Sequence, residues 1–197
     1  MATSVHPHDL GLTWLETTGL RRAAHAVRDG ERVWLIDPFE DAVALTAAAE
    51  LGRPAGVIQL LDRHNRDCSS IAQRLEIPRW RLPDSVADSP FEVVPVVAQR
   101  WWREIALWWG EQRALIVAEA VGTAPVFALG RRLGVHPMLR LTPPKAALSG
   151  LQPERLLVGH GRPIETGAAA ALSEALAAAR GDIPRLAFAL PSLVRGG

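Results

Sequence analysis

The sequence contains no tyrosine and only one cysteine, Cys68, among its 197 residues. A single cysteine cannot form a disulfide within the chain, so a disulfide-stabilised fold is excluded. No apolar run approaches the roughly 18 to 20 residues of a membrane-spanning helix. The amino terminus, with His6 and His8, lacks the basic and apolar regions of a signal peptide. We therefore expect a cytoplasmic protein that does not bind membranes.

An excess of charge of one sign is also missing. The chain carries 22 Lys and Arg against 21 Asp and Glu, which gives a net charge of +1. Such a balance does not favour nucleic acid as a partner. Hydrophobic residues make up 48% of the sequence, which is enough for one sizeable core. We expect a single domain over residues 1–197, with its core between about 12 and 180 and a loose tail at 191–197.

The order of apolar and alanine-rich segments predicts a mixed α/β fold. Expected strands are 12–16, 22–27, 33–36, 57–61, 80–82, 91–97 and 155–158. Expected helices are 41–51, 69–75, 123–133 and 166–180, with a short one from 143. The span 101–109 fits both helical spacing and the first strand of a hairpin that returns through 114–118, and we favour the hairpin.

A charged heptapeptide, residues 62–68, lies between the apolar strand 57–61 and the helix expected from Ser69, whose serines suit a helix N-cap. Strand-to-helix junctions at the carboxyl ends of strands are where α/β folds commonly bind ligands. The heptapeptide therefore predicts a functional site.

Three landmarks in the chain resemble the metallo-β-lactamase superfamily: Ile36-Asp37-Pro38, the junction at 63–68, and Val158-Gly159-His160-Gly161-Arg162-Pro163. The resemblance covers most of residues 12–180 and implies a four-layer αββα sandwich. It also implies a two-metal hydrolase site, built on a His-x-His-x-Asp-His loop, a further His, a bridging Asp and a His in a late Gly-His-Gly turn.

Carried over to this chain, the loop motif is largely replaced. Arg63 stands at the first His, Asn65 at the second, Asp67 at the Asp and Cys68 at the last His. Only the aspartate matches the motif. His64 is off the pattern and is interpreted as a solvated or hydrogen-bonded loop residue.

The downstream positions are also altered. Arg100 stands at the next His, Glu119 replaces the bridging Asp, and His160 matches the last His. Guanidinium offers no lone pair, so the resemblance implies that the first metal site is lost. The second site, Asp67, Cys68, Glu119 and His160, could still hold one zinc or iron ion.

The alternative to a metal is a polar centre in which Arg63 and Arg100 supply the counter-charges, so that no cofactor is present, and we favour it. Cys68 is then a small buried residue, and its use as a nucleophile is the less favoured hypothesis. Asp37 either ties the loop as in the family or forms an Asp-Pro turn. An anionic ligand could bind to Arg63, Arg66 and Arg100, with Asp37 near them.

The sequence therefore predicts a catalytically degenerate member of this superfamily that binds a small anionic ligand or a protein partner. The alternative is a single-metal hydrolase at Asp67, Cys68, Glu119 and His160. A tryptophan-rich segment at 101–109 is interpreted as core packing. A homodimer through this surface is a third hypothesis, because aromatic residues are enriched at interfaces.

Overall fold

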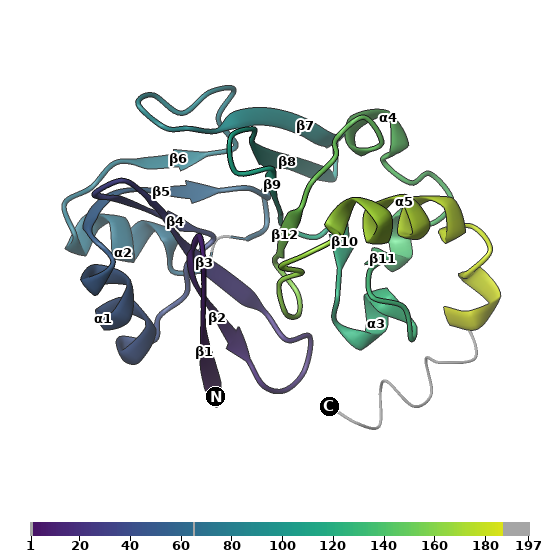
Figure 1. The fold of residues 1–197 in the computed structure, drawn as a ribbon, viewed down its shortest axis with the longest axis horizontal. Coiled ribbons are helices and arrows are strands. Elements are labelled where there is room, and N and C mark those ends of the chain that lie inside the picture. The colour runs from purple at the N-terminus through teal and green to yellow at the C-terminus, as the bar shows by residue number, and fades with distance from the viewer. Residues whose placement is uncertain (1, 65, 187–197) are drawn as a thin grey trace.

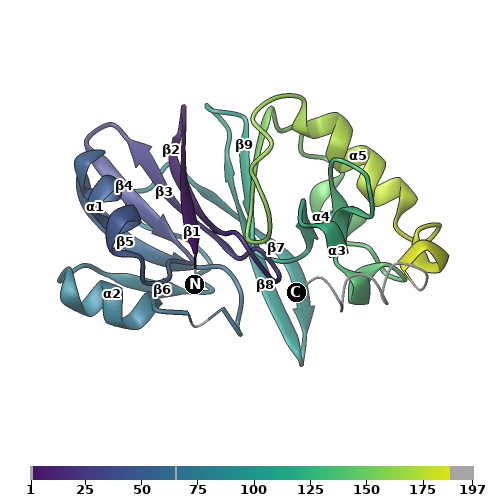
Figure 2. The same ribbon diagram turned by 90° about the horizontal axis from the view of Figure 1, so that it is seen from below.

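The computed structural model describes residues 2–64 and 66–186. Its two large sheets pack face to face, and helices cover the outer side of each, as Figures 1 and 2 show. This arrangement is the four-layer αββα sandwich that the sequence predicts.

The first sheet has six strands in the order of the sequence: β1 (Thr3–His8), β2 (Gly11–Glu16), β3 (Ala23–Asp29), β4 (Arg32–Ile36), β5 (Arg53–Gln59) and β6 (Arg79–Arg81). Strands β1 to β4 form an antiparallel meander, whereas β4, β5 and β6 are parallel. The parallel pairs require crossover helices, and these are α1 (Ala42–Glu50) and α2 (Cys68–Arg74).

The second sheet has the order β12 (Arg155–Val158), β9 (Ala114–Val117), β8 (Trp102–Trp109) and β7 (Glu92–Gln99). A small sheet of β10 (Val121–Gly122) and β11 (Gly134–Val135) follows β9. The helices of this half are α3 (Pro125–Ala128), the 3-10 helix η1 (Pro137–Leu139), α4 (Lys145–Leu148) and α5 (Ala168–Ala178). Strands β8 and β9 form the hairpin favoured from the sequence.

Alternation along the strands divides the apolar residues between two cores. In β4, Trp34 and Ile36 belong to the core between the sheets, while Val33 and Leu35 belong to the core that includes residues of α1 and α2. Both faces of this strand are therefore buried, which accounts for its continuous apolar run.

The two sheets are joined by backbone contacts at one end of the sandwich. Ile105 donates its N–H to the Leu60 carbonyl at 2.9 Å, and Ala23 donates to Gly159 at 2.8 Å. Isolated bridges also join Leu61 to Glu104 and Arg22 to His160. The segments that follow β5, β9 and β12 are thereby brought to the same place.

Several element boundaries differ from the sequence-based predictions. Helix α2 begins at Cys68 with Asp67 as its N-cap, so the serines lie inside the first turn. Helix α3 ends at Ala128 rather than near residue 133, because Leu129 adopts a left-handed backbone with φ of 47°. Strands β1, β10 and β11 were not expected, and the predicted tail at 191–197 lies outside the described residues.

Within the described ranges, no helix combines the length and apolar character needed to cross a lipid bilayer.

Candidate metal centre

Three side chains from separate strand ends meet at the joined end of the sheets. His64 follows β5, Glu119 follows β9 and His160 follows β12. The His64 Nε2 atom lies 3.0 Å from Glu119 Oε1, and the His160 Nε2 atom lies 3.3 Å from the same oxygen. The three ligand atoms all lie within 4.8 Å of one another. This cluster contains two predicted site residues and one histidine that is off the family's motif.

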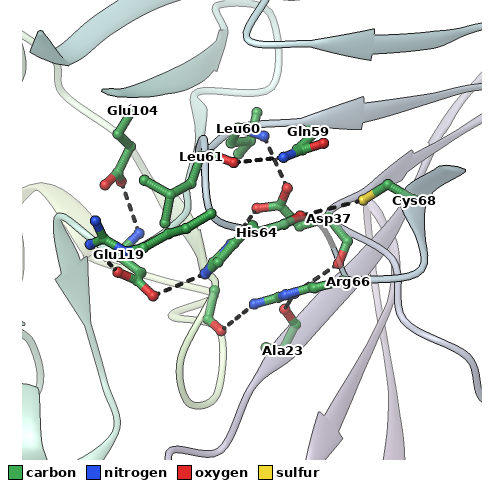
Figure 3. A network of polar contacts seen from close by, with 12 residues as sticks. Ala23, Asp37, Gln59, Leu60, Leu61, His64, Arg66, Cys68, Glu104 and Glu119 are labelled. Carbon is green, nitrogen blue, oxygen red and sulfur yellow. Dashed lines mark hydrogen bonds and ion pairs between the residues drawn. The ribbon is translucent and has the colours of Figure 1, made fainter. Parts of the chain in front are cut away.

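His64 is held in place through Asp37. The His64 Nδ1 atom is 2.9 Å from Asp37 Oδ2, while Asp37 Oδ1 accepts the Leu60 N–H at 2.9 Å. Figure 3 shows His64 lying between the carboxylates of Asp37 and Glu119. Asp37 thus ties the loop to the end of β5, as the resemblance implied, but through His64.

The hydrogen bonds of the two rings define their tautomers. The Leu20 carbonyl can only accept, so His160 Nδ1, 3.0 Å away, carries a proton and donates it. Asp37 imposes the same protonation on Nδ1 of His64. In their neutral forms both rings therefore direct an Nε2 lone pair at the same Glu119 oxygen. Such an arrangement needs a proton or a cation between the atoms.

The carboxylates shift the titration of the cluster. Burial and the Arg66 guanidinium lower the pKa of His64, but Asp37 and Glu119 outweigh them, so this pKa is raised. Burial would raise the pKa of Glu119, yet the His160 and His64 rings, which donate to it when they are protonated, and the Arg63 guanidinium hold this pKa well below its usual range. Glu119 is therefore an anion surrounded by cationic or polar donors.

Arg63 completes the surroundings of Glu119. Its NH2 group donates to Glu119 Oε2 at 2.8 Å, and its Cζ lies 4.0 Å from the centroid of the Trp102 ring. The Arg63 side chain is 40% exposed. One edge of the guanidinium is thus used by the protein, while the rest faces the surface.

Glu104 fixes the backbone on which Glu119 stands. Its Oε1 accepts the N–H groups of Glu119 and Ala120, both at 2.8 Å, and its Oε2 accepts the Trp102 indole N–H at 2.9 Å. Figure 3 shows this carboxylate beside the Glu119 segment. Burial raises the pKa of Glu104 to about 7 against these donors. Sequence reasoning missed Glu104, although an acid in a strand that is apolar except for Arg103 was a signal.

Asp67 and Cys68 lie away from the cluster. Asp67 Oδ2 accepts the Glu40 N–H at 2.8 Å. The Cys68 thiol lies against the carbonyls of Pro38 and His64, at 3.8 and 3.7 Å, and burial raises its pKa to about 12. A thiol with this pKa is a poor nucleophile and a poor ligand at neutral pH. The predicted four-ligand set is therefore not brought together here.

The three arginines of the predicted anion site are also separated. The Arg66 guanidinium donates to the carbonyls of Ala23, Asp37 and Gly159, at 2.5, 2.7 and 3.3 Å, so it joins the two sheets. Arg100 is exposed in the turn between β7 and β8, and no described residue pairs with its side chain. Asn65, assigned to the second His position, lies outside the described residues.

The tryptophan-rich segment is mainly interior. Trp102 and Trp109 are buried, whereas Trp101 is 54% exposed. Core packing, the favoured interpretation, is therefore confirmed for Trp102 and Trp109. Of these three residues, Trp101 lies at the surface.

Comparison with solved structures identifies the fold. The chain matches TMB-1 with a TM-score of 0.65 and 12% identity, over 95% of this chain and 99% of that one. It matches the mono-zinc form of the metallo-β-lactamase FIM-1 from Pseudomonas aeruginosa with a TM-score of 0.61 and 10% identity, over 91% and 97%. The di-iron-bound form of TTHA1623 gives 0.55 and 18%, over 76% and 92%.

No protein-family model matches the sequence, and neither does a curated protein. The structural matches nevertheless agree with one another and cover most of the chain. The protein has the metallo-β-lactamase fold, as its three sequence landmarks indicate. Within that fold, the described residues offer a His-Glu-His group that can hold a metal ion.

Proposed function

We propose that this protein binds one zinc or iron ion through His64, Glu119 and His160, and that it has lost the two-metal hydrolysis associated with its fold. The observation that carries the proposal is the convergence of both Nε2 atoms on Glu119 Oε1, while each Nδ1 is held by an acceptor. Imidazole and carboxylate are ligands that zinc and iron commonly take.

The surroundings of these three residues suit ligation. Metal-binding histidines usually donate their other ring N–H to a carboxylate or a carbonyl, which orients the ring. Asp37 does this for His64 and the Leu20 carbonyl for His160. Glu104 holds the backbone N–H of Glu119. The chain therefore supplies both the donor atoms and the contacts that orient them.

Among the described residues, those near the cluster do not provide a second set of ligands. Arg63 has no lone pair to offer a cation. Asp67 bonds to the Glu40 backbone, and the Cys68 thiol stays protonated at neutral pH. This is why we propose one ion rather than two. A bound ion would supply a positive charge that attracts an anion or polarises a carbonyl group.

A second candidate function is a single-metal hydrolase, and the position of Arg63 favours it. The guanidinium lies beside Glu119 and is partly exposed, so it could stabilise negative charge on a reacting oxygen. An esterase and phosphodiesterase screen of the metal-loaded protein tests this candidate. Activity that disappears in Arg63→Gln but not in Arg28→Gln would support it.

Metal binding itself is tested by elemental analysis of protein purified without chelator, followed by zinc titration. We expect one ion per chain, and a loss of affinity of at least about 100-fold in His64→Gln and in His160→Gln. Cys68→Ser and Asp67→Asn are the matched controls from the same loop, and they should bind as the wild type does. Absence of stoichiometric metal would contradict the proposal, and so would loss of metal in the controls only.

A further inference from the structure

A cavity lies at the end of the first sheet that is opposite to the metal cluster. Its volume is about 420 Å³, which is in the range of small-molecule sites. Strands β4, β5 and β6 are parallel, and residues at or near their starts line the cavity, whereas His64 follows the end of β5. The cavity is therefore separate from the metal site.

Trp80 gives this cavity an aromatic wall. Its six-membered ring lies against Gly56, since a Cβ atom added to Gly56 would lie only 2.1 Å from Trp80 Cζ3. The ring centroid of Trp34 is 5.7 Å from that of Trp80. Trp34 is 2% exposed and supports Trp80 from inside, while Trp80 stays partly exposed and lines the cavity. A flat apolar group packs well on such a wall.

Arg32 organises the polar rim of the cavity. Its Nη1 donates to the Asp88 carbonyl, its Nη2 donates to the Asp29 carboxylate at 2.7 Å, and its Cζ lies 6.0 Å from the Trp34 ring centroid. Arg53 stands opposite Arg32 in the pairing of β4 with β5. Arg32 thus has Arg53 beside it in the sheet and Asp88 bonded to its guanidinium, and Asp29 balances its charge.

Arg53 and Asp88 are the two charged residues of this rim that are left without counter-charges. Both are exposed, and both line the cavity. Neither side chain has a hydrogen-bond or ion-pair partner among the described residues, and the two do not pair with each other. A free cation and a free anion beside one apolar wall complement a ligand that carries both charges and an apolar group.

We propose that this cavity binds an aromatic α-amino acid, with its carboxylate on Arg53, its ammonium group on Asp88 and its ring on Trp80. Guanidinium pairs with carboxylate through two parallel hydrogen bonds, and a carboxylate accepts the N–H groups of an ammonium ion. A simple anion would have Asp88 as a like charge beside it, and a simple cation would have Arg53. The proposal does not depend on the proposed metal.

Calorimetric titration of the full chain in a buffer that contains EDTA tests the proposal, because the chelator prevents the amino acid from binding through a metal. The ligands are L-phenylalanine, L-alanine, 3-phenylpropanoate and 2-phenylethylamine. Phenylalanine should bind at least about tenfold more tightly than alanine, because its ring is buried. It should bind at least about threefold more tightly than either singly charged ligand, because each lacks one ion pair.

Variants assign the contacts. Arg53→Gln should weaken phenylalanine binding at least about threefold without weakening 2-phenylethylamine, and Asp88→Asn should do so without weakening 3-phenylpropanoate. Trp80→Leu should weaken all three aromatic ligands at least about fivefold. Arg28→Gln and Asp84→Asn, at exposed positions outside the cavity, are the matched controls and should bind as the wild type does. Thermal unfolding verifies the fold, and the two exposed rim positions keep the test valid if Trp80→Leu unfolds the chain.

The proposal is overturned if phenylalanine does not bind, if a singly charged ligand binds as tightly as phenylalanine, or if Arg53→Gln and Asp88→Asn both retain wild-type affinity. His160→Gln, which removes a proposed metal ligand, should bind phenylalanine as the wild type does. Loss of binding in His160→Gln would place the amino acid at the metal cluster and would overturn the proposal as well.

Discussion

The two halves of the loop at 63–68 face different parts of the molecule. Arg63 and His64 are directed at Glu119, across the junction of the sheets, whereas Asp67 and Cys68 contact the segment from Pro38 to Glu40 in the first half of the sandwich. Between them, Arg66 has a left-handed backbone and bonds to carbonyls of both sheets.

This difference separates the loop residue that could contact an ion from those that bond to the neighbouring backbone. The motif positions occupied by Asp67 and Cys68 serve structure, and the off-pattern His64 takes their place beside Glu119 and His160. The direction of each side chain, rather than its position in the motif, decides which residues can meet an ion.

The largest expected effect comes from Arg66, which separates the two halves of the loop. Arg66→Met should destabilise the protein by about 4 kcal/mol, since it removes the guanidinium from three carbonyl groups, of which only that of Gly159 is known to keep another donor, the Ala23 N–H. Arg63→Met, which changes a side chain that is 40% exposed, should lower the free energy of unfolding by less than about 1 kcal/mol. Urea unfolding of both variants checks the contrast, and equal effects would show that Arg66 does not anchor the loop.

Folding shifts the pKa values of two buried histidines, His25 and His64, in opposite directions. Burial lowers the pKa of His25 to about 3, whereas the carboxylates beside His64 raise its pKa. Below about pH 6.5 the unfolded chain takes up a proton on His25, while the folded chain does not. The free energy of unfolding therefore decreases as the pH is lowered from 6.5 towards 3. Lowering the pH from 7 to 4 should decrease the free energy of unfolding by about 3 kcal/mol through this residue.

Urea unfolding as a function of pH measures this loss, and His25→Gln provides the comparison. The variant should show a flatter pH dependence between pH 4 and pH 7 than the wild type. An unchanged slope would mean that His25 is not the group that titrates on unfolding.

The anchor of His64 should matter more for metal binding than the acid in the other half of the loop. Asp37→Asn should lower zinc affinity by about 10- to 100-fold, as expected when the partner of a ligating histidine is altered. Asp67→Asn should have no effect on zinc affinity, because its carboxylate bonds to the Glu40 backbone. Competition with a chromogenic chelator compares the two, and the opposite order would reject our assignment of the two acids.

The smallest expected effect is that of Cys68→Ser. The thiol makes long contacts with two carbonyls and is buried in the core that includes residues of α1 and α2, so the substitution should destabilise the fold by about 1 kcal/mol and leave zinc affinity unchanged. Thermal unfolding and zinc titration measure both quantities. A substantial loss of zinc affinity would return Cys68 to the ligand set.

The fold could be predicted from the sequence because its signals are local. The apolar runs at Val33 and Leu156, the hairpin at Trp102 and the Gly-His-Gly turn each mark an element or a junction that the structure contains. Helix ends were less predictable: the boundary of α3 depends on the left-handed Leu129, which no local pattern indicated.

The site was only partly predictable because it depends on directions set by tertiary contacts. The resemblance placed Glu119 and His160 in one site, and the structure has them after the neighbouring parallel strands β9 and β12. The position of His64 could not be predicted, because it depends on the hydrogen bonds that Arg66 and Asp37 make around the loop. Glu104 lies on β8, and its bonds to the N–H groups of Glu119 and Ala120 bring it near the cluster.

One ion held by His64, Glu119 and His160 is what we propose for this site. Anomalous diffraction at the zinc and iron absorption edges, from crystals of protein purified without chelator, tests it most directly. We predict a single peak at about 2.0 to 2.2 Å from Nε2 of both histidines and from a Glu119 oxygen. Two peaks, a peak beside Asp67 and Cys68, or no peak would contradict the claim.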